Sequence, residues 1–116
     1  MNQMRYALLI YIDEKLAPQT NNEAAAISAD YQAFGERYKA QILAGDALQR
    51  IATATTVQVR GGKTLTTDGP FAETKEQLIG FYLVECDNVD EAVEIASHIP
   101  SAAQGSIEVR PVMMFA

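Results

Sequence analysis

Two stretches of the chain are almost continuously apolar. Residues 6–12 read YALLIYI, and residues 79–86 read IGFYLVEC. Short apolar runs without polar alternation are typical of strands that are covered on both faces. We therefore predict buried strands over residues 5–12 and 79–86.

A long amphipathic pattern follows the first run. Thr20 and Glu23 have the spacing of a capping box, with Thr20 as the N-cap. The large apolar residues beyond them recur at steps of four, three, four and four: Ile27, Tyr31, Phe34, Tyr38 and Ile42. This periodicity predicts one helix with a single apolar face, ended by Gly45 as the C′ glycine.

A second helix is predicted near the C-terminus. Asn88 lies three residues before Glu91, which is a capping pattern, and Pro100 ends the helix just after Ile99. Its inner face is marked by Ala92, Ala96 and Ile99.

Three further runs favour strands. Residues 55–60 and 63–67 flank Gly61-Gly62, a pair that tolerates the positive φ of a hairpin turn. Residues 106–114 form the last strand, and Pro111 within it indicates an edge or a strand end.

The predicted order is β-α-(β hairpin)-β-α-β in one domain spanning residues 1–116. This order points to an α+β ferredoxin-like sandwich. Two helices cover one face of such a sheet, yet its inner strands are apolar on both faces. An apolar face of that size is rare on a monomer, so we expect a homodimer in which a second copy covers it.

Composition narrows the choice of partners. The net charge of −6 removes the usual electrostatic drive toward nucleic acid. Cys86 is the only cysteine, which excludes an intrachain disulfide and fits a reducing compartment. The apolar run at 6–12 is too short to cross a bilayer. No ligand spacing or nucleotide motif points to a metal or cofactor. We expect a cytoplasmic protein with no membrane partner.

The segment over residues 68–77, DGPFAETKEQ, joins the hairpin to the second apolar strand. Gly69-Pro70 is a turn signal, and Pro70 has no N–H with which Asp68 could form an Asx turn. Three charges follow within four residues, beside a strand that we predict to be buried: Glu73, Lys75 and Glu76. Charge at the mouth of an apolar cleft is a common setting for a ligand site.

Residues 68–76, DGPFAETKE, closely resemble the signature of the DGPF proteins, a branch of the YCII-related family. Residues 45–49 (GDALQ), 52–57 (ATATTV) and 107–111 (IEVRP) extend the resemblance over residues 4–112. The resemblance implies a ferredoxin-like fold that pairs into a dimeric α+β barrel. It also implies frequent gene neighbourhood with extracytoplasmic-function sigma factors, and it supplies no established activity.

The wider YCII-related group implies acid–base chemistry by a histidine in helix one and an aspartate that precedes a proline after helix two. In this chain Ile99 precedes Pro100, and the only histidine, His98, ends helix two. The pair is therefore not carried over. We interpret His98 as a side chain that complements the C-terminal partial charge of its helix.

Asp68 is the candidate acid–base residue, with equal weight given to a structural role in which it accepts backbone N–H groups of the loop. Arg110 should face away from the helices, because Ile107 and Val109 should face toward them. It would hold an anionic ligand there, although an internal pair with Glu108, Asp68 or Glu73 is the favoured reading.

Other residues are candidate ligand contacts beside a structural alternative. A solvated or interface cluster is the first reading of Glu73, Lys75 and Glu76, and contact with an acidic substrate is a second reading of Lys75. Tyr11 and Tyr82 are read first as core residues and second as cleft residues. Phe71 is expected to anchor its loop on the core, and Cys86 to be a buried, inert thiol.

Two functions remain open at this point. The first is a cleft that binds a small polar or anionic molecule, with acid–base chemistry at Asp68. The second is a non-enzymatic regulatory or interaction module linked to a sigma factor. The sequence does not decide whether the chain is an enzyme.

Overall fold

The computed structural model describes residues 3–17 and 20–115. Its main sheet contains four strands in the order β2-β5-β1-β6, and every neighbouring pair is antiparallel. The strands are β1 (Met4–Ile12), β2 (Ile42–Ala47), β5 (Gln77–Cys86) and β6 (Ser106–Pro111). The two apolar runs of the sequence are thus the two central strands, and the chain is an α+β protein.

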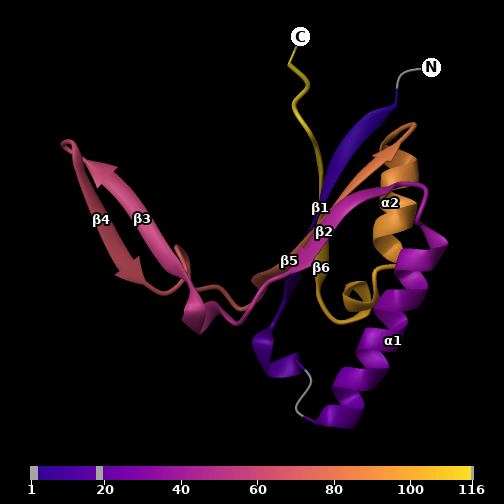
Figure 1. The fold of residues 1–116 in the computed structure, drawn as a ribbon, viewed down its shortest axis with the longest axis horizontal. Helices are drawn as coiled ribbons and strands as arrows, with labels where there is room; N and C mark the ends of the chain where they lie inside the picture. The colour runs from indigo at the N-terminus through magenta and orange to yellow at the C-terminus, as the bar shows by residue number, and fades with distance from the viewer. Residues whose placement is uncertain (1–2, 18–19, 116) are drawn as a thin grey trace.

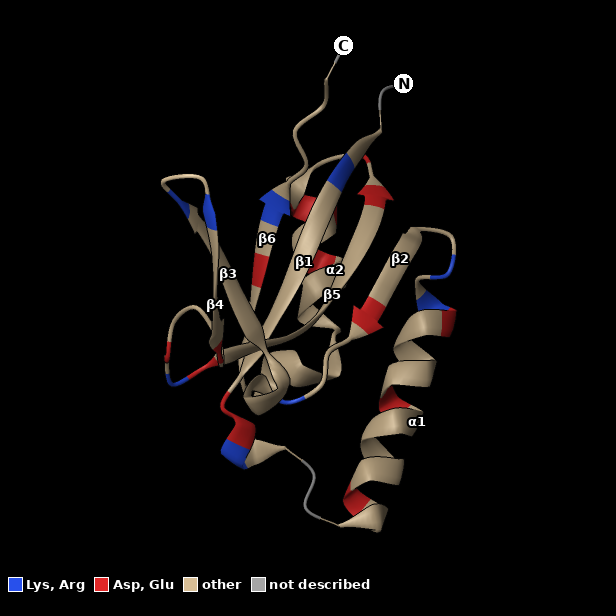
Figure 2. Ribbon diagram, turned by 60° about the vertical axis from the view of Figure 1, so that its left-hand side comes forward, with Lys and Arg blue, Asp and Glu red and all other residues tan. Residues whose placement is uncertain are grey.

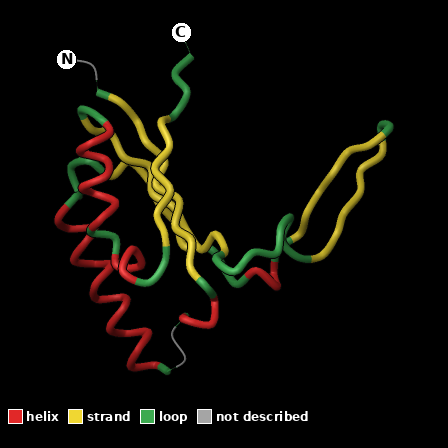
Figure 3. Tube along the Cα trace, turned by 180° about the vertical axis from the view of Figure 1, so that it is seen from behind, coloured by secondary structure: helices red, strands yellow, loops and turns green. Residues whose placement is uncertain are grey.

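Two helices, α1 (Asn21–Arg37) and α2 (Val89–Ser97), cover the same face of this sheet (Figure 1). Both predicted caps are present, because Thr20 Oγ1 accepts from the N–H of Glu23 and Asn88 Oδ1 from the N–H of Glu91. Figure 3 shows both helices on one side of the strands, with the opposite face of the sheet uncovered by any helix.

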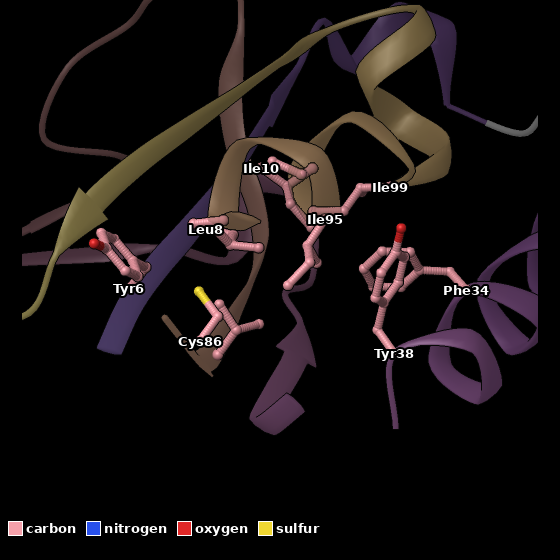
Figure 4. Packing of buried hydrophobic residues seen from close by; sticks show 11 residues of the cluster. Tyr6, Leu8, Ile10, Phe34, Tyr38, Cys86, Ile95 and Ile99 are labelled. Carbon is pink, nitrogen blue, oxygen red and sulfur yellow. The ribbon is translucent and has the colours of Figure 1, made fainter. Parts of the chain in front are cut away.

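The core lies between this helical layer and the sheet. Alternate residues of β1 are buried, including Tyr6, Leu8 and Ile10, and they pack with Ile95 and Ile99 from the region of α2 (Figure 4). The alternation follows from the pleat, which sends successive side chains to opposite faces. The other face of β1 is only partly buried, so the expected covering of both faces is not present within one chain.

The first helix is shorter than its periodicity predicts. Helix α1 ends at Arg37 with Tyr38 as its C-cap, and Ile42 begins strand β2. The prediction of a longer helix is wrong because Ile42 pairs with Val84 of β5. Ile42 still packs against the core, but from a strand and not from a helix. Tertiary pairing has overridden a helical spacing.

Gly45 is likewise not a helix C′ residue, because it lies within β2 opposite Tyr82. A Cβ at this position would lie 2.5 Å from Cδ1 of the Tyr82 ring and 2.9 Å from the carbonyl oxygen of Phe81. Glycine is therefore required here by the close approach of the neighbouring strand.

The predicted hairpin exists, but it does not belong to the main sheet. Strands β3 (Thr55–Arg60) and β4 (Lys63–Asp68) form a separate two-stranded sheet that projects from the body as an arm (Figure 1). The turn uses Gly61 and Gly62 at φ of 58° and 77°, as expected. The strand missing from the predicted order is β2, which takes the edge position beside β5.

Phe71 does not anchor its loop, because its side chain is 82% exposed. Pro111 ends the edge strand β6, in agreement with the expectation for a proline. The strand stops there and does not continue to Met114.

Candidate functional site

A cleft of about 690 Å³ separates the first half of α1 from the sheet. The apolar face of α1 explains it. Phe34 and Tyr38 near the end of the helix are buried in the core, whereas Ile27 is exposed and Tyr31 only half-buried. The helix therefore diverges from the sheet toward its N-terminus, and Ile27 and Tyr31 become walls of the cleft.

The cleft has an apolar lining with a few polar groups, which is the usual composition of a small-molecule site. Its apolar walls come from β1, α1, β5 and the 3-10 helix η3 (Pro100–Ala103), and include Ile10, Ile12, Ile27, Ile79 and Pro100. Tyr31 and Ser101 form a hydroxyl pair at 2.6 Å across it, from α1 to η3.

Tyr82 also lines the cleft, and its ring contacts the ring of Phe34 at 5.0 Å between centroids. Burial raises the pKa of the Tyr82 phenol, and the nearby Tyr31 raises it further. Both effects disfavour a phenolate. The phenol is therefore a neutral hydrogen-bonding group at physiological pH.

Three carboxylates border the cleft: Glu14 from the 3-10 helix η1 (Glu14–Leu16), Asp30 from α1 and Asp46 from β2. Glu14 Oε2 accepts a hydrogen bond of 2.9 Å from the N–H of Ile51, which joins η1 to the segment that enters the arm. Arg50 lies next to this contact and also lines the cleft.

A second, more open depression of about 670 Å³ lies at the foot of the arm. It shares Glu14 and Arg50 with the cleft, so the two adjoin. The residues that complete it come from η1, from the segment entering the arm and from the segment returning to β5: Asp13, Lys15, Ile51, Thr74, Lys75 and Gln77.

The predicted site residues do not gather in one place. Asp68 ends β4 opposite Thr55, at the foot of the arm, and is exposed. Within residues 3–17 and 20–115, no backbone or side-chain group donates a hydrogen bond to its carboxylate, so the expected N–H bonds of the loop are not formed. Asp68 and Glu73 line neither depression, whereas Lys75 lines the second.

Tyr11 and Tyr82 lie on opposite faces of the sheet. Tyr82 pairs with the buried Leu8 on the helical face. Tyr11 lies on the open face, where its hydroxyl donates to Glu108 at 3.4 Å. Burial, followed by the charge of Glu108, raises the pKa of Tyr11. The two tyrosines therefore cannot contact one ligand within a single chain.

Arg110 points to the open face, as its alternation with Ile107 and Val109 predicts. The favoured internal ion pair is wrong, because over the described part of the chain Arg5 and Glu85 make the one ion pair. Arg110 is exposed and opposite Ala7 in register. An exposed guanidinium does not pay the cost of a buried charge, so Arg110 needs no carboxylate partner.

The remaining polar candidates follow their structural readings. His98 caps α2, and its Nδ1–H donates to the carbonyl oxygen of Glu94 at 2.9 Å. Cys86 is buried, and this burial raises the pKa of its thiol. No group of three His, Cys, Asp or Glu side chains suited to a metal ion occurs in the described ranges.

Several lining residues were missed by reasoning from the sequence, among them Asp30, Arg50 and Ser101. Asp30 adjoins Tyr31 on the helix and lies outside the apolar periodicity that predicts this helix. Arg50 and Ser101 lie outside any periodic pattern. The one feature of the sequence that marks them is their position, Arg50 shortly after β2 and Ser101 directly after Pro100. Their convergence depends on the way the chain packs.

Comparison with known proteins decides the family. Residues 4–116 match the YCII-related domain. The chain belongs to the YCII-related family. An uncharacterized protein of Rhizobium meliloti (strain 1021) is 38% identical over 117 residues, covering 97% of this chain and 94% of the relative. The name of this relative states no activity. The function of this YCII-related protein must therefore be inferred from the geometry of its site.

None of the helices within the described ranges is both long enough and apolar enough to cross a membrane.

Proposed function

We propose that this YCII-related protein binds a small organic molecule in the cleft between α1 and the sheet. The observation that carries the proposal is the cleft of about 690 Å³, in which apolar walls surround the Tyr31–Ser101 hydroxyl pair and the phenol of Tyr82. A pocket of this size with a few convergent polar groups suits a metabolite rather than a macromolecule.

The acid–base pair that the wider family implies would fall in this same region, but this chain lacks both of its residues. Helix α1 and Pro100 both line the cleft. In this chain Ile99 is buried in the core in place of the aspartate, and no histidine lies in α1. Any acid–base chemistry here would have to use other groups, and Glu14, Asp30 and Asp46 are the carboxylates at the cleft. Their position at the cleft favours these three over Asp68, which lies outside it.

The test is a metabolite screen read by amide NMR shifts, with two variants that separate the cleft from the rest of the molecule. Ala47→Trp should fill the cleft, because Ala47 lies on its β2 wall. Ala33→Trp is the control, because Ala33 is exposed on α1 outside the lining. We expect hits that shift the amides near Tyr31 and Ser101. Ala47→Trp should abolish their binding, and Ala33→Trp should not.

A comparison of Asp30→Asn with Asp68→Asn tests whether a carboxylate of the cleft or the carboxylate of the loop contacts the ligand. Asp30→Asn should weaken the binding of a hit that carries a hydroxyl or amine, and Asp68→Asn should leave it unchanged. Hits whose shifts avoid the cleft, or binding that only Asp68→Asn abolishes, would contradict the proposal and return the site to the loop over residues 68–76.

We further infer a cytoplasmic homodimer of the DGPF branch, with a ferredoxin-like arrangement that closes into an α+β barrel. The order β2-β5-β1-β6 with both helices on one face supports the arrangement. The signature at residues 68–76 supports the branch. The partly apolar open face, with Leu9 opposite Phe81, supports the pairing. Arg110 and Tyr11 would then face the second copy.

The alternative is an interaction module that acts with a sigma factor. Its support is the arm, whose Val57, Val59 and Leu65 are 58%, 58% and 47% exposed. Large apolar side chains exposed on a projecting hairpin are available to a protein partner. Deletion of residues 57–66 would abolish capture of a purified sigma factor in this case and leave metabolite binding intact.

A further inference from the structure

We propose that the depression at the foot of the arm binds the anionic group of the ligand whose organic body occupies the cleft. The substrate class is then a phosphorylated or carboxylated molecule with an apolar body. The placement of the organic body in the cleft rests on the proposed function. The anion site does not, and it can be tested by itself.

Three cations surround the depression. Lys15 comes from η1, Arg50 from the segment entering the arm, and Lys75 from the segment leaving it. They are far apart in sequence and brought together by the fold at one end of the sheet, where charged segments gather around the foot of the arm (Figure 2). Such convergence is notable in a chain with a net charge of −6.

None of these cations is committed to a carboxylate. Across the described parts of the chain, Lys15, Arg50 and Lys75 have no ion pair, although Asp13 and Glu14 line the same depression. Each carboxylate accepts one backbone hydrogen bond, Asp13 Oδ1 from the N–H of Lys15 at 3.0 Å and Glu14 Oε2 from that of Ile51 at 2.9 Å, and the three cations of the lining outnumber the two carboxylates. The ammonium and guanidinium groups therefore remain available to a ligand anion.

The backbone around the cations is held in place by hydrogen bonds. Gln77 is the one buried polar side chain within the described ranges, and its Nε2 donates to the carbonyl oxygen of Thr74 at 2.6 Å. Glu76 Oε1 accepts from the hydroxyl of Ser106 at 2.7 Å, which ties the returning segment to β6. The backbone that carries Lys75 is thus positioned before any ligand arrives, which lowers the entropic cost of binding.

The shared lining defines the ligand. Arg50 and Glu14 border both the depression and the apolar cleft. A molecule with its apolar body against Ile27 and Ile79 would place an acidic group at Arg50, within the field of Lys15 and Lys75. This arrangement also gives a role to the TKE portion of the loop at residues 74–76, which the cleft by itself leaves without one.

The test uses three probes with the full chain: inorganic phosphate, 3-phenylpropyl phosphate and 3-phenylpropanol. Amide NMR titrations should show the phosphate ester binding at least about tenfold more tightly than the alcohol, the factor that one charge-assisted hydrogen bond supplies. Lys15→Gln and Lys75→Gln should each weaken the ester by about tenfold and leave the alcohol unchanged.

Lys63→Gln is the matched control. Lys63 is exposed on the arm and lines neither depression, so its substitution removes the same charge at a distance from the site. It should leave ester binding unchanged. Inorganic phosphate should shift the amides of Thr74 and Lys75 even in the Ala47→Trp protein, whose cleft is filled.

Equal affinity for ester and alcohol, or an effect of Lys63→Gln as large as that of Lys75→Gln, would overturn the anion site. Phosphate shifts that persist while the alcohol leaves the cleft amides unmoved would instead contradict the proposed function and leave the anion site standing.

Discussion

Single residues in this protein are constrained mainly by what lies opposite them. Leu8 is fully buried because it faces the helices, while its neighbour Leu9 faces the open side and is only partly covered. Gly45 is constrained by the Tyr82 ring, which also forms a wall of the cleft. A packing requirement and a feature of the site thus meet at one contact.

Replacing Gly45 with alanine should destabilise the fold by about 1–3 kcal/mol, the usual range for an overpacked site. The added Cβ meets a ring and a backbone carbonyl oxygen at under 3.0 Å, and the carbonyl belongs to the paired strand. Urea unfolding followed by circular dichroism measures the change.

The control is Gly35→Ala, since Gly35 lies in α1 and a Cβ there has nothing within 4 Å. It should stabilise the protein by about 1 kcal/mol through helix propensity. Equal effects of the two substitutions would mean that the contact between β2 and Tyr82 yields without cost.

At the scale of elements, the helices are set by their N-caps and by the strands that they cover. The capping groups of α1 and α2 could be recognised from three-residue spacings, because a cap is a local contact. The end of α1 could not, because it depends on the pairing of Ile42 with β5.

The cap of α2 should be worth about 1 kcal/mol, so Asn88→Ala should lower the free energy of unfolding by that amount. Its Oδ1 accepts from the N–H of Glu91 at 3.0 Å, and Glu91 in turn accepts from the N–H of Asp87 at 3.0 Å.

Thermal and urea unfolding give the value, with Asn22→Ala as the comparison. Asn22 is exposed in the first turn of α1 and caps nothing, so its substitution should change stability by less than about 0.5 kcal/mol. A loss as large as that of Asn88→Ala would show that composition and not capping sets the effect.

At the scale of the whole molecule, the helices cover one face of the sheet and leave the other open. The arm and the C-terminal Met113, Met114 and Phe115 add further exposed apolar surface. A folded chain with this much exposed apolar area gains free energy from association, since burial of apolar surface is favourable at about 25 cal/mol per Å².

If the homodimer inferred above forms, sedimentation at micromolar concentration should give the mass of two chains. Leu9→Lys should convert the sample to monomers, because Leu9 lies on the open face opposite Phe81 and Glu108. Gln32→Lys adds the same charge at an exposed position of α1 and should leave the dimer intact. A monomeric parent protein would refute the dimer.

Local patterns in the sequence determined the α+β class, the two central strands, both N-caps and the Gly-Gly turn, because each depends on neighbours within a few residues. The position of the hairpin, the edge strand β2 and the two depressions were decided only by tertiary structure. The arm separates because its strands pair with each other and not with β5. The cleft opens because α1 diverges from the sheet before Tyr31, and Lys15, Arg50 and Lys75 meet because the foot of the arm returns to the end of β1. These are long-range arrangements, and no spacing along the chain records them.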